Sequence, residues 1–365
     1  MNLCRNGFVL VILMAVSMFV SGCSHHGHDN DGTPAAPAPG AYITGFYLND
    51  SDVFIPVYWK DGVLNYLDPL VPGKRSRATA VDIEGSDIYI AGSCNDDNDV
   101  SVAGYWKNNV WTSLPSLVAT EDARAKGILV KGSDVYVVGG SESEVMEVPG
   151  YWLNGVWNAL PTLADNGGSA VSITTDGTDI YISGYTINSS DQEVMCYWKN
   201  GTRTDSTTVD SSPSINGGMT IALSSDGVLI PGFEYSNPSS IYWPGYMDEN
   251  GTWIDIENLD DDQHSEARAI YVSDSDVYMA GYSYNSDHDG RAVYWKNTEI
   301  KDLEDEGSPQ YIYVIDNTVY AVGFNDSENE FGHWKDDSGV ISWTAYEMPP
   351  DFNYFGVITG GKYVP

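Results

Sequence analysis

The chain has 365 residues, and its 52 acidic side chains against 17 basic ones give a formal net charge of −35. A surface this acidic repels nucleic acid and anionic lipid headgroups, so nucleic acid is excluded as a partner. The same charge favours solubility outside the cytoplasm, with divalent cations as counterions.

Residues 1–22 have the pattern of an export signal, with Arg5 followed by an apolar run, Phe8–Val20, that is too short to span a bilayer comfortably. The run ends in Val20-Ser21-Gly22-Cys23, which resembles the lipobox of bacterial lipoproteins. The resemblance implies cleavage before Cys23, acylation of its thiol and, since Ser24 follows, sorting to the outer membrane of the cell envelope, on either face. The alternative is an ordinary signal peptide that happens to contain a cysteine.

Residues 23–40 are rich in Pro, Ala, Gly and polar side chains, which predicts a flexible tether. The segment contains His25, His26 and His28 beside two aspartates, so a loose Zn or Cu site is one interpretation. A solvated linker is the other, because a mobile segment loses entropy when it organises ligands. Cleavage after residue 22 removes one positive charge, that of Arg5, and leaves −36.

The remaining residues, 41–365, contain a repeat whose phase is marked by a glycine at the end of a Val-Tyr-Val-Ala-Gly-like strand. These glycines are Gly45, Gly92, Gly139, Gly184, Gly232, Gly281 and Gly323. The steps between them are 47, 47, 45, 48, 49 and 42 residues. Strand-rich repeats of this length predict an all-β fold, a β-propeller, and seven phases predict seven blades in one domain.

Each repeat divides into four short strand patterns, illustrated by the third. Ala123–Gly132 is an alternating run, and Asp134–Gly140 is β-branched and aromatic. A third strand contains Tyr151-Trp152, and Asn154-Gly155 then predicts a two-residue hairpin turn into a fourth strand. No segment has a 3.6-residue period, so we expect antiparallel four-stranded blades and little helix.

The domain begins and ends in the middle of a repeat, and this predicts how the ring closes. Ala41–Gly45 is a second-strand pattern with no first strand before it, and Phe355–Gly361 has the first-strand pattern. We expect these terminal strands to pair in one blade, which removes an open edge. The repeat resembles secreted bacterial propeller-repeat proteins, with their Tyr-Trp-Lys-Asn-Gly hairpins. The resemblance implies the fold and says little about activity.

Tryptophans recur at two positions of the repeat, which favours core packing over ligand stacking. The first position holds Trp59, Trp106, Trp152, Trp198, Trp295 and Trp334, and the second holds Trp111, Trp157, Trp253 and Trp343. Trp243 is outside both positions and is the better candidate for stacking on a ligand, with loop packing as the alternative. Cys94 and Cys196 are either a disulfide that links distant repeats or two buried thiols.

Basic residues recur at first-strand positions that we expect to face the central channel. Arg77 and Arg124 share one phase, and Lys126 and Arg268 share another, two residues later. One interpretation is an anion site for a carboxylate or uronic-acid sugar, in which the arginines donate bidentate hydrogen bonds. The other is ion pairing with nearby Asp82, Glu121, Asp122 and Glu266. His264, in a loop beside the channel, is a further candidate.

Two loops carry oxygen ligands on alternate residues, a pattern that suits Ca²⁺. They contain Asn95, Asp97 and Asp99, and Asn285, Asp287 and Asp289. The second resembles the start of an EF-hand loop, but Lys296 occupies the place of the bidentate glutamate and no helix flanks it. Turn chemistry is the alternative interpretation, so we expect either no cofactor or Ca²⁺.

No H-E-x-x-H, G-x-S-x-G, P-loop or paired-cysteine motif is present, so the sequence assigns no catalytic residue. We expect a lipid-anchored, monomeric propeller that is a non-enzymatic binding or scaffold module for a protein or glycan ligand. The alternative is a carbohydrate-active lyase or hydrolase at the channel mouth that uses Arg124, Arg268 and His264. A membrane, through the lipid on Cys23, is the other expected partner.

Overall fold

The computed structural model describes residues 40–207, 220–236, 241–261 and 263–365. Ala35–Pro365 form one compact unit. The described residues contain strands and turns and no helix, as the sequence predicted. Accordingly, this part of the chain offers no helix of the length and apolarity that crossing a membrane requires. Cys23 and the histidines of the tether are outside the described residues.

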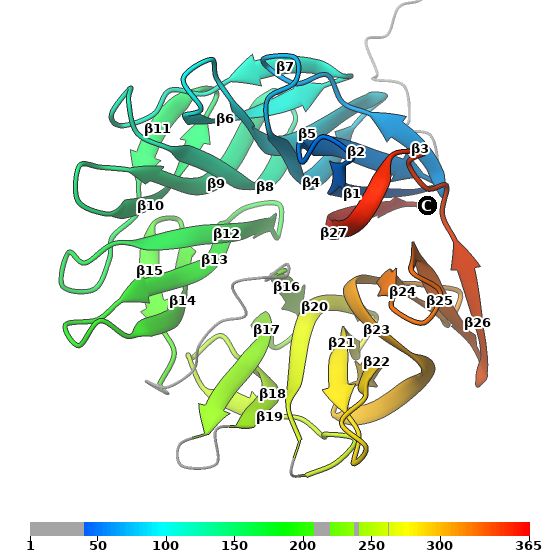
Figure 1. Cartoon of the computed structure of the whole chain (residues 1–365). Helices are drawn as coiled ribbons and strands as arrows, with labels where there is room; N and C mark the ends of the chain where they lie inside the picture. The colour runs from blue at the N-terminus through cyan, green and yellow to red at the C-terminus, as the bar shows by residue number, and fades with distance from the viewer. Residues whose placement is uncertain (1–39, 208–219, 237–240, 262) are drawn as a thin grey trace, which may run out of the picture. The chain divides into compact units, whose positions relative to one another are not determined.

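Five antiparallel sheets have four strands each, and they succeed one another in a propeller-like ring (Figure 1). The first consists of β27 (Phe352–Val364), β1 (Gly40–Asn49), β2 (Phe54–Lys60) and β3 (Val63–Tyr66). The second consists of β4 (Ser76–Glu84), β5 (Asp87–Asn95), β6 (Ser101–Lys107) and β7 (Val110–Ser113). The third consists of β8 (Ala123–Lys131), β9 (Asp134–Glu142), β10 (Glu147–Leu153) and β11 (Val156–Ala159).

Two further four-stranded sheets follow in the chain. One consists of β12 (Gly168–Thr175), β13 (Ile180–Ile187), β14 (Glu193–Lys199) and β15 (Thr202–Asp205). The other consists of β16 (Ala222–Ser224), β17 (Gly227–Ser236), β18 (Ile241–Met247) and β19 (Trp253–Asp255). In these two sheets, and in the second and third, each strand pairs with the next one along the chain, whereas in the first sheet β27 pairs with β1.

The last sheet has seven strands rather than four, which differs from the seven separate sheets expected. Its strands are β20 (Ser265–Ser273), β21 (Asp276–Tyr284), β22 (Gly290–Lys296), β23 (Glu299–Ile315), β24 (Thr318–Asn325), β25 (Glu330–Asp337) and β26 (Val340–Ala345). β23 is 17 residues long, and it pairs with β22 through Glu299–Glu306 and with β24 through Gly307–Ile315. The distance in sequence between the repeated glycines Gly281 and Gly323 is 42 residues, the shortest of the six steps. This shorter repeat leaves no separate loop between the outer strand of one repeat and the first strand of the next.

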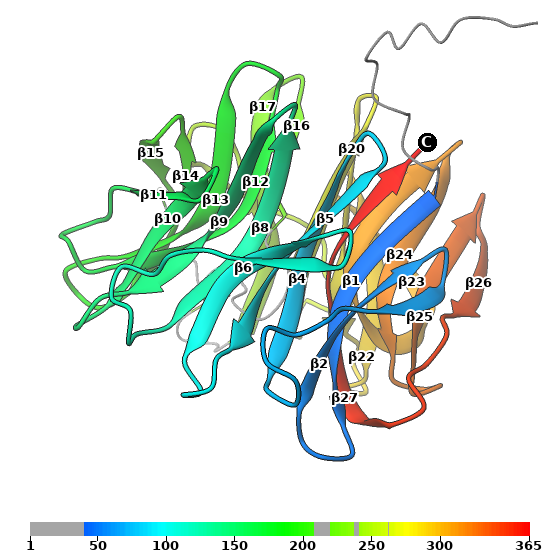
Figure 2. The ribbon, with the colours of Figure 1, turned by 90° about the horizontal axis from the view of Figure 1, so that it is seen from above.

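The strand from the C-terminal end of the chain pairs with the first strand. β27 lies beside β1 in both ribbon views (Figures 1 and 2), and their antiparallel register runs from Gly40 opposite Val364 to Asn49 opposite Phe352. The ring of Tyr363 also stacks on that of Tyr313 in β23, with centroids 5.3 Å apart and planes 4° from parallel. The C-terminal strand is therefore tied to elements at both ends of the chain.

The recurring tryptophans are core residues, as predicted. The six at the first position have no exposed surface. Each indole N–H donates to an oxygen on the segment that precedes its own blade: Trp152 to the Pro115 carbonyl at 2.7 Å and Trp198 to the Pro161 carbonyl at 2.9 Å are examples. Burying one such side chain contributes on the order of 5 kcal/mol before entropic costs. These tryptophans are buried between neighbouring sheets.

The second recurring tryptophan explains the glycine that precedes the Tyr-Trp pair. A Cβ atom on Gly150 would lie 2.5 Å from the Trp157 ring, and the same clash occurs at Gly104, Gly245 and Gly332. The turn between these strands also matches the sequence prediction, since Asn154 and Gly155 both have positive φ. Cys94 and Cys196 are buried free thiols, so the disulfide interpretation is wrong and the alternative holds.

Candidate ligand-binding channel

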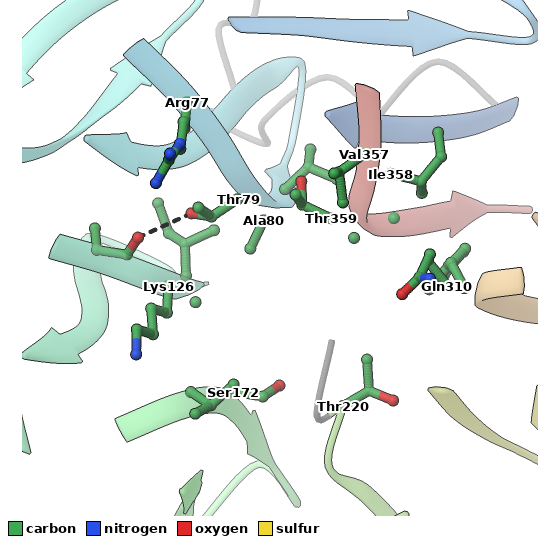
Figure 3. Close-up of a pocket in the computed structure, with 18 of the residues that line it drawn as sticks. Arg77, Thr79, Ala80, Lys126, Ser172, Thr220, Gln310, Val357, Ile358 and Thr359 are labelled. Atoms are coloured by element: carbon green, nitrogen blue, oxygen red, sulfur yellow. Dashed lines mark hydrogen bonds between the residues drawn. The ribbon is translucent and has the colours of Figure 1, made fainter. Parts of the chain in front are cut away.

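A cavity of about 1300 Å³ is lined by residues from the innermost strand of every sheet repeat (Figure 3). These strands are β4, β8, β12, β16, β20, β23 and β27. Figure 3 shows Thr79, Ser172, Gln310 and Thr359 around this space, each from a different strand. The cavity is therefore the central channel that the repeat pattern predicted.

A β-bulge at the same position of the innermost strands determines which side chains line the channel. In β4 the register with β5 shifts between Ala78 and Ala80, so Thr79 is the extra, unpaired residue. The same shift occurs around Lys126, Val171, Arg268, Gln310 and Thr359. A bulge bends its strand and changes the direction of the extra side chain. All six of these residues line the cavity.

Hydroxyl groups at the bulges join neighbouring blades. Thr79 donates from Oγ1 to the Ala125 carbonyl at 3.1 Å, and Thr359 donates in the same way to the Ala78 carbonyl at 2.9 Å. Both acceptors are the residue just before the next strand's bulge, where the ladder is interrupted. The hydroxyl satisfies a carbonyl that the bulge removes from regular pairing.

The structure brings together the four basic residues that the sequence placed at channel-facing positions, and three of them are paired. Arg124 forms ion pairs with Asp122 and, at 2.8 Å, with Glu142. Arg268 pairs with Glu266 at 3.0 Å.

Lys126 donates to the Ser169 hydroxyl at 2.6 Å and has Glu147 at 3.7 Å. Asp82, another expected acidic partner, instead pairs with Lys362 at 3.0 Å. No ion pair of Glu121 is found among the residues the structure describes. Ion pairing therefore accounts for Arg124, Arg268 and Lys126, with a partly different set of acids from the one expected.

Arg77 is the exception. No carboxylate forms an ion pair with it in the described part of the chain, and its guanidinium carbon instead lies 4.5 Å from the Phe54 ring centroid and 5.2 Å from that of Phe46. The side chain of Arg77 is exposed at the cavity wall, but the surrounding protein partly desolvates its guanidinium, which lowers the pKa of Arg77 below its ordinary value. The positive charges of Arg124 and Arg75 lower this pKa further. Arg77 is thus held among like charges.

Arg75, Phe46 and Phe54 also line the cavity, and the sequence did not indicate them as site residues. The Arg75 guanidinium carbon lies 5.4 Å from the Phe54 centroid. The one available signal was the Arg-x-Arg spacing at residues 75 and 77, which places both side chains on the same side of an extended segment. The contact between Arg75 and Phe54 joins the segment before β4 to β2 of another sheet. No sequence pattern predicts it.

His264 and Trp243, the other two candidates, do not line this cavity. The Nδ1 atom of His264 accepts a hydrogen bond from the Tyr242 backbone N–H at 3.1 Å, and its ring packs between Tyr242 and Tyr284. Trp243 is partly buried on β18, opposite Glu234 of β17. The predicted combination of His264 with Arg124 and Arg268 is therefore not assembled at the channel.

The two candidate calcium loops use their oxygens to close their own turns. Asn285 Oδ1 accepts the backbone N–H groups of Asp287 and Asp289 at 3.0 and 2.9 Å. In the other loop Asp96 accepts equivalent bonds, and Asp99 pairs with Lys74 at 2.8 Å. Within the described ranges no three His, Cys, Asp or Glu side chains are grouped to hold a metal ion. These contacts are turn chemistry.

One carboxylate of the channel lining has no ion-pair partner among the described residues. Asp326, just beyond the end of β24, lines the cavity beside Phe324. Burial raises the pKa of Asp326 above its ordinary value. A carboxyl group with a raised pKa is a possible proton donor.

No protein-family model matches the sequence, and no curated protein matches it. Several solved structures are similar in shape. A protein assigned as a 6-phosphogluconolactonase of Bacteroides uniformis has 13% identity and a TM-score of 0.49, with 89% of this chain and 99% of that chain covered.

A Trypanosoma rangeli sialidase has 10% identity and a TM-score of 0.43, with 77% and 55% covered. An ulvan lyase, a polysaccharide lyase, has 10% identity and a TM-score of 0.47, with 86% and 93% covered. At this level of similarity neither the activity nor the ligand of these proteins transfers to this chain.

Proposed function

We propose that this protein is a binding module that holds an acidic ligand, a glycan or a protein segment, in its channel without converting it. One observation supports this most strongly. The chain has 17 basic and 52 acidic residues, yet the described cavity lining contains six basic residues and four acidic ones. The basic residues are Arg75, Arg77, Arg124, Lys126, Arg268 and Lys362. Four of the six are ion-paired, so the positive charge available to a ligand is that of Arg75 and Arg77, which no carboxylate pairs with in the described part of the chain. An unneutralised positive charge at a cavity wall of an acidic protein attracts anions.

The proposal includes a ring of seven blades. β23 is counted twice, as the outer strand of one blade and the innermost strand of the next, because its two halves pair with different strands. The pairing of β1 with β27 then closes the ring by combining both ends of the domain in one blade. A closed ring holds the channel walls at fixed positions without a ligand, which lowers the entropic cost of binding.

The proposal also places the protein in the bacterial cell envelope, anchored by a lipid on Cys23, with the outer membrane as its expected location. The support is the lipobox-like sequence that ends the export signal. Mass spectrometry of the protein purified from bacterial membranes tests the anchor: an unmodified Cys23 thiol would contradict it.

Binding and turnover measurements on the full chain test the function. We expect acidic oligosaccharides or peptides to bind, neutral ones of the same length to bind more weakly, and affinity to fall as salt screens the channel charges. We expect no shortened or unsaturated product. Equal binding of neutral and acidic ligands would contradict the proposal, and so would sustained turnover.

A carbohydrate-active lyase or hydrolase is the second candidate, and Asp326 is the observation that favours it. This unpaired carboxyl group lines the same cavity as the basic residues and has a raised pKa. If the protein is such an enzyme, Asp326→Asn will abolish product formation while leaving ligand affinity within a few-fold. The binding-module proposal instead predicts no product from either protein.

A further inference from the structure

Arg75, which immediately precedes β4, and Arg77, near the start of β4, have no carboxylate partner in the described part of the chain. Arg75 and Arg77 are both exposed, and both are adjacent to the edge-to-face pair formed by Phe46 and Phe54, whose centroids are 5.3 Å apart. An aromatic ring that covers the face of a guanidinium leaves the N–H groups in its plane available to other acceptors. The phenylalanines therefore hold the two arginines without using their hydrogen-bond donors.

Two acids of the cavity lining, Asp99 and Asp122, are already engaged. Asp99 pairs with Lys74 at 2.8 Å. Asp122 pairs with Arg124 and accepts a hydrogen bond from the Ser101 backbone N–H at 2.8 Å. The chain has three times as many acidic residues as basic ones, so most arginines have acids available to pair with. Two arginines at a cavity wall that pair with no acid are therefore candidates for binding an external anion.

The surroundings of this arginine pair also fit a sugar. Ser93 is opposite Arg77 in the register of β4 with β5, and the Asn95 backbone N–H donates to the Arg75 carbonyl. Both residues line the cavity, as does Ser101. Hydroxyl and amide groups of this kind hydrogen-bond to sugar hydroxyls as donors or acceptors. The volume of about 1300 Å³ exceeds the range of roughly 300–1,000 Å³ that is usual for a single small ligand, which gives room for several sugar units.

We propose that Arg75 and Arg77 form a carboxylate subsite for a glycan that carries carboxylated sugars. This inference rests on the binding function proposed above and specifies the class of ligand and the residues that recognise it. A guanidinium fork matches a planar carboxylate through two parallel N–H···O bonds. A bound carboxylate would also offset the positive charges of Arg124 and Arg75 that surround Arg77.

Calorimetric titration of the full chain with three glycans tests the inference. The probes are an oligogalacturonate, its neutral methyl ester and an oligosaccharide of similar length that carries sulfate esters but no carboxylate. We expect the wild-type protein to bind the oligogalacturonate, and Arg75→Ala with Arg77→Ala to weaken that binding by about ten- to a hundredfold, the loss typical of charged hydrogen bonds. The methyl ester should bind the wild type as weakly as the acid binds the double variant.

Two further variants separate the carboxylate site from folding and from general charge. Arg75→Lys with Arg77→Lys keeps both charges and loses the planar fork, so we expect intermediate affinity. Arg291→Ala removes an arginine that pairs with Asp302 outside the cavity lining, and affinity should be unchanged. If the double alanine variant does not fold, the double lysine variant still tests the inference. Wild-type affinity in that variant would show that the planar guanidinium groups are not needed and would overturn the proposed carboxylate recognition.

The outcomes distinguish this inference from the general binding function. Wild-type binding that survives in a folded double alanine variant overturns the subsite and leaves the function standing. Equal affinity for the methyl ester, or binding of the sulfated glycan alone, overturns the carboxylate class. If none of the three glycans binds but an acidic peptide does, the glycan inference fails while the channel function stands. Failure of every acidic ligand would contradict both.

Discussion

His333 gives the protein a defined sensitivity to acid. It stands where the other repeats have a tyrosine, such as Tyr151, and it packs against Tyr320 and Tyr346 with ring centroids 5.4 and 5.6 Å away. Burial, with a smaller contribution from Lys335, lowers the pKa of His333 from 6.5 to about 4. Its Nδ1 atom is buried and has no hydrogen-bond partner.

The sign of the effect follows from which state binds the proton. Above pH 6.5 the imidazole is neutral in both states and contributes no pH dependence. Between pH 6.5 and about 4 the unfolded chain takes up a proton that the folded chain does not, so the free energy of unfolding falls as the pH falls. With one pKa unit equal to about 1.4 kcal/mol, the loss approaches roughly 3 kcal/mol at the acid end and is about 2 kcal/mol at pH 5.

Urea denaturation of the wild type and of His333→Tyr at pH 7.5 and pH 5 tests this reasoning. Other groups titrate in both proteins, so the quantity to compare is the difference in unfolding free energy between them. We expect that difference to shift in favour of His333→Tyr by about 2 kcal/mol at the lower pH. A difference that is the same at both pH values would refute the assignment of the acid sensitivity to His333.

Three further changes have defined expected results. Gly150→Ala forces a Cβ against Trp157 and should lower the unfolding free energy by about 1–3 kcal/mol in thermal or urea denaturation; an unchanged value would contradict the packing described. Deleting residues 352–365 removes the partner of β1 and exposes a sheet edge, so light scattering should detect aggregates that the full chain does not form. Chelation with EDTA should leave the melting temperature unchanged, because Asn285 already bonds its own loop; a drop would indicate a structural metal.

Most of the fold could be predicted because its determinants are local and repeated. Gly139, Trp152 and the Asn154-Gly155 turn each have counterparts at a nearly constant spacing, and each has a physical role that the structure retains. The continuous β23 could not be predicted in the same way. Its two halves belong to different repeats, and only the short step between Gly281 and Gly323 indicated that the connection was missing.

The candidate site could be predicted only in part. Strand alternation placed Arg77 and Arg124 on the channel side because side-chain direction follows from position in the strand. The bulges that turn Lys126 and Arg268 inward, and the contact between Arg75 and Phe54, depend on how separate strands and sheets pack. The absence of a carboxylate partner at Arg77 could not be predicted either. Acidic residues are near each of the channel arginines in the sequence, and only the folded chain determines which of them pair.

A crystal structure of the full chain with a bound oligogalacturonate would test the central claim most directly. The account predicts electron density in the channel, with a sugar carboxylate within hydrogen-bond distance, about 2.7–2.9 Å, of the Arg75 and Arg77 guanidinium groups. Density for the glycan on the outer strands, or in the channel with its carboxylates directed away from both arginines, would contradict it.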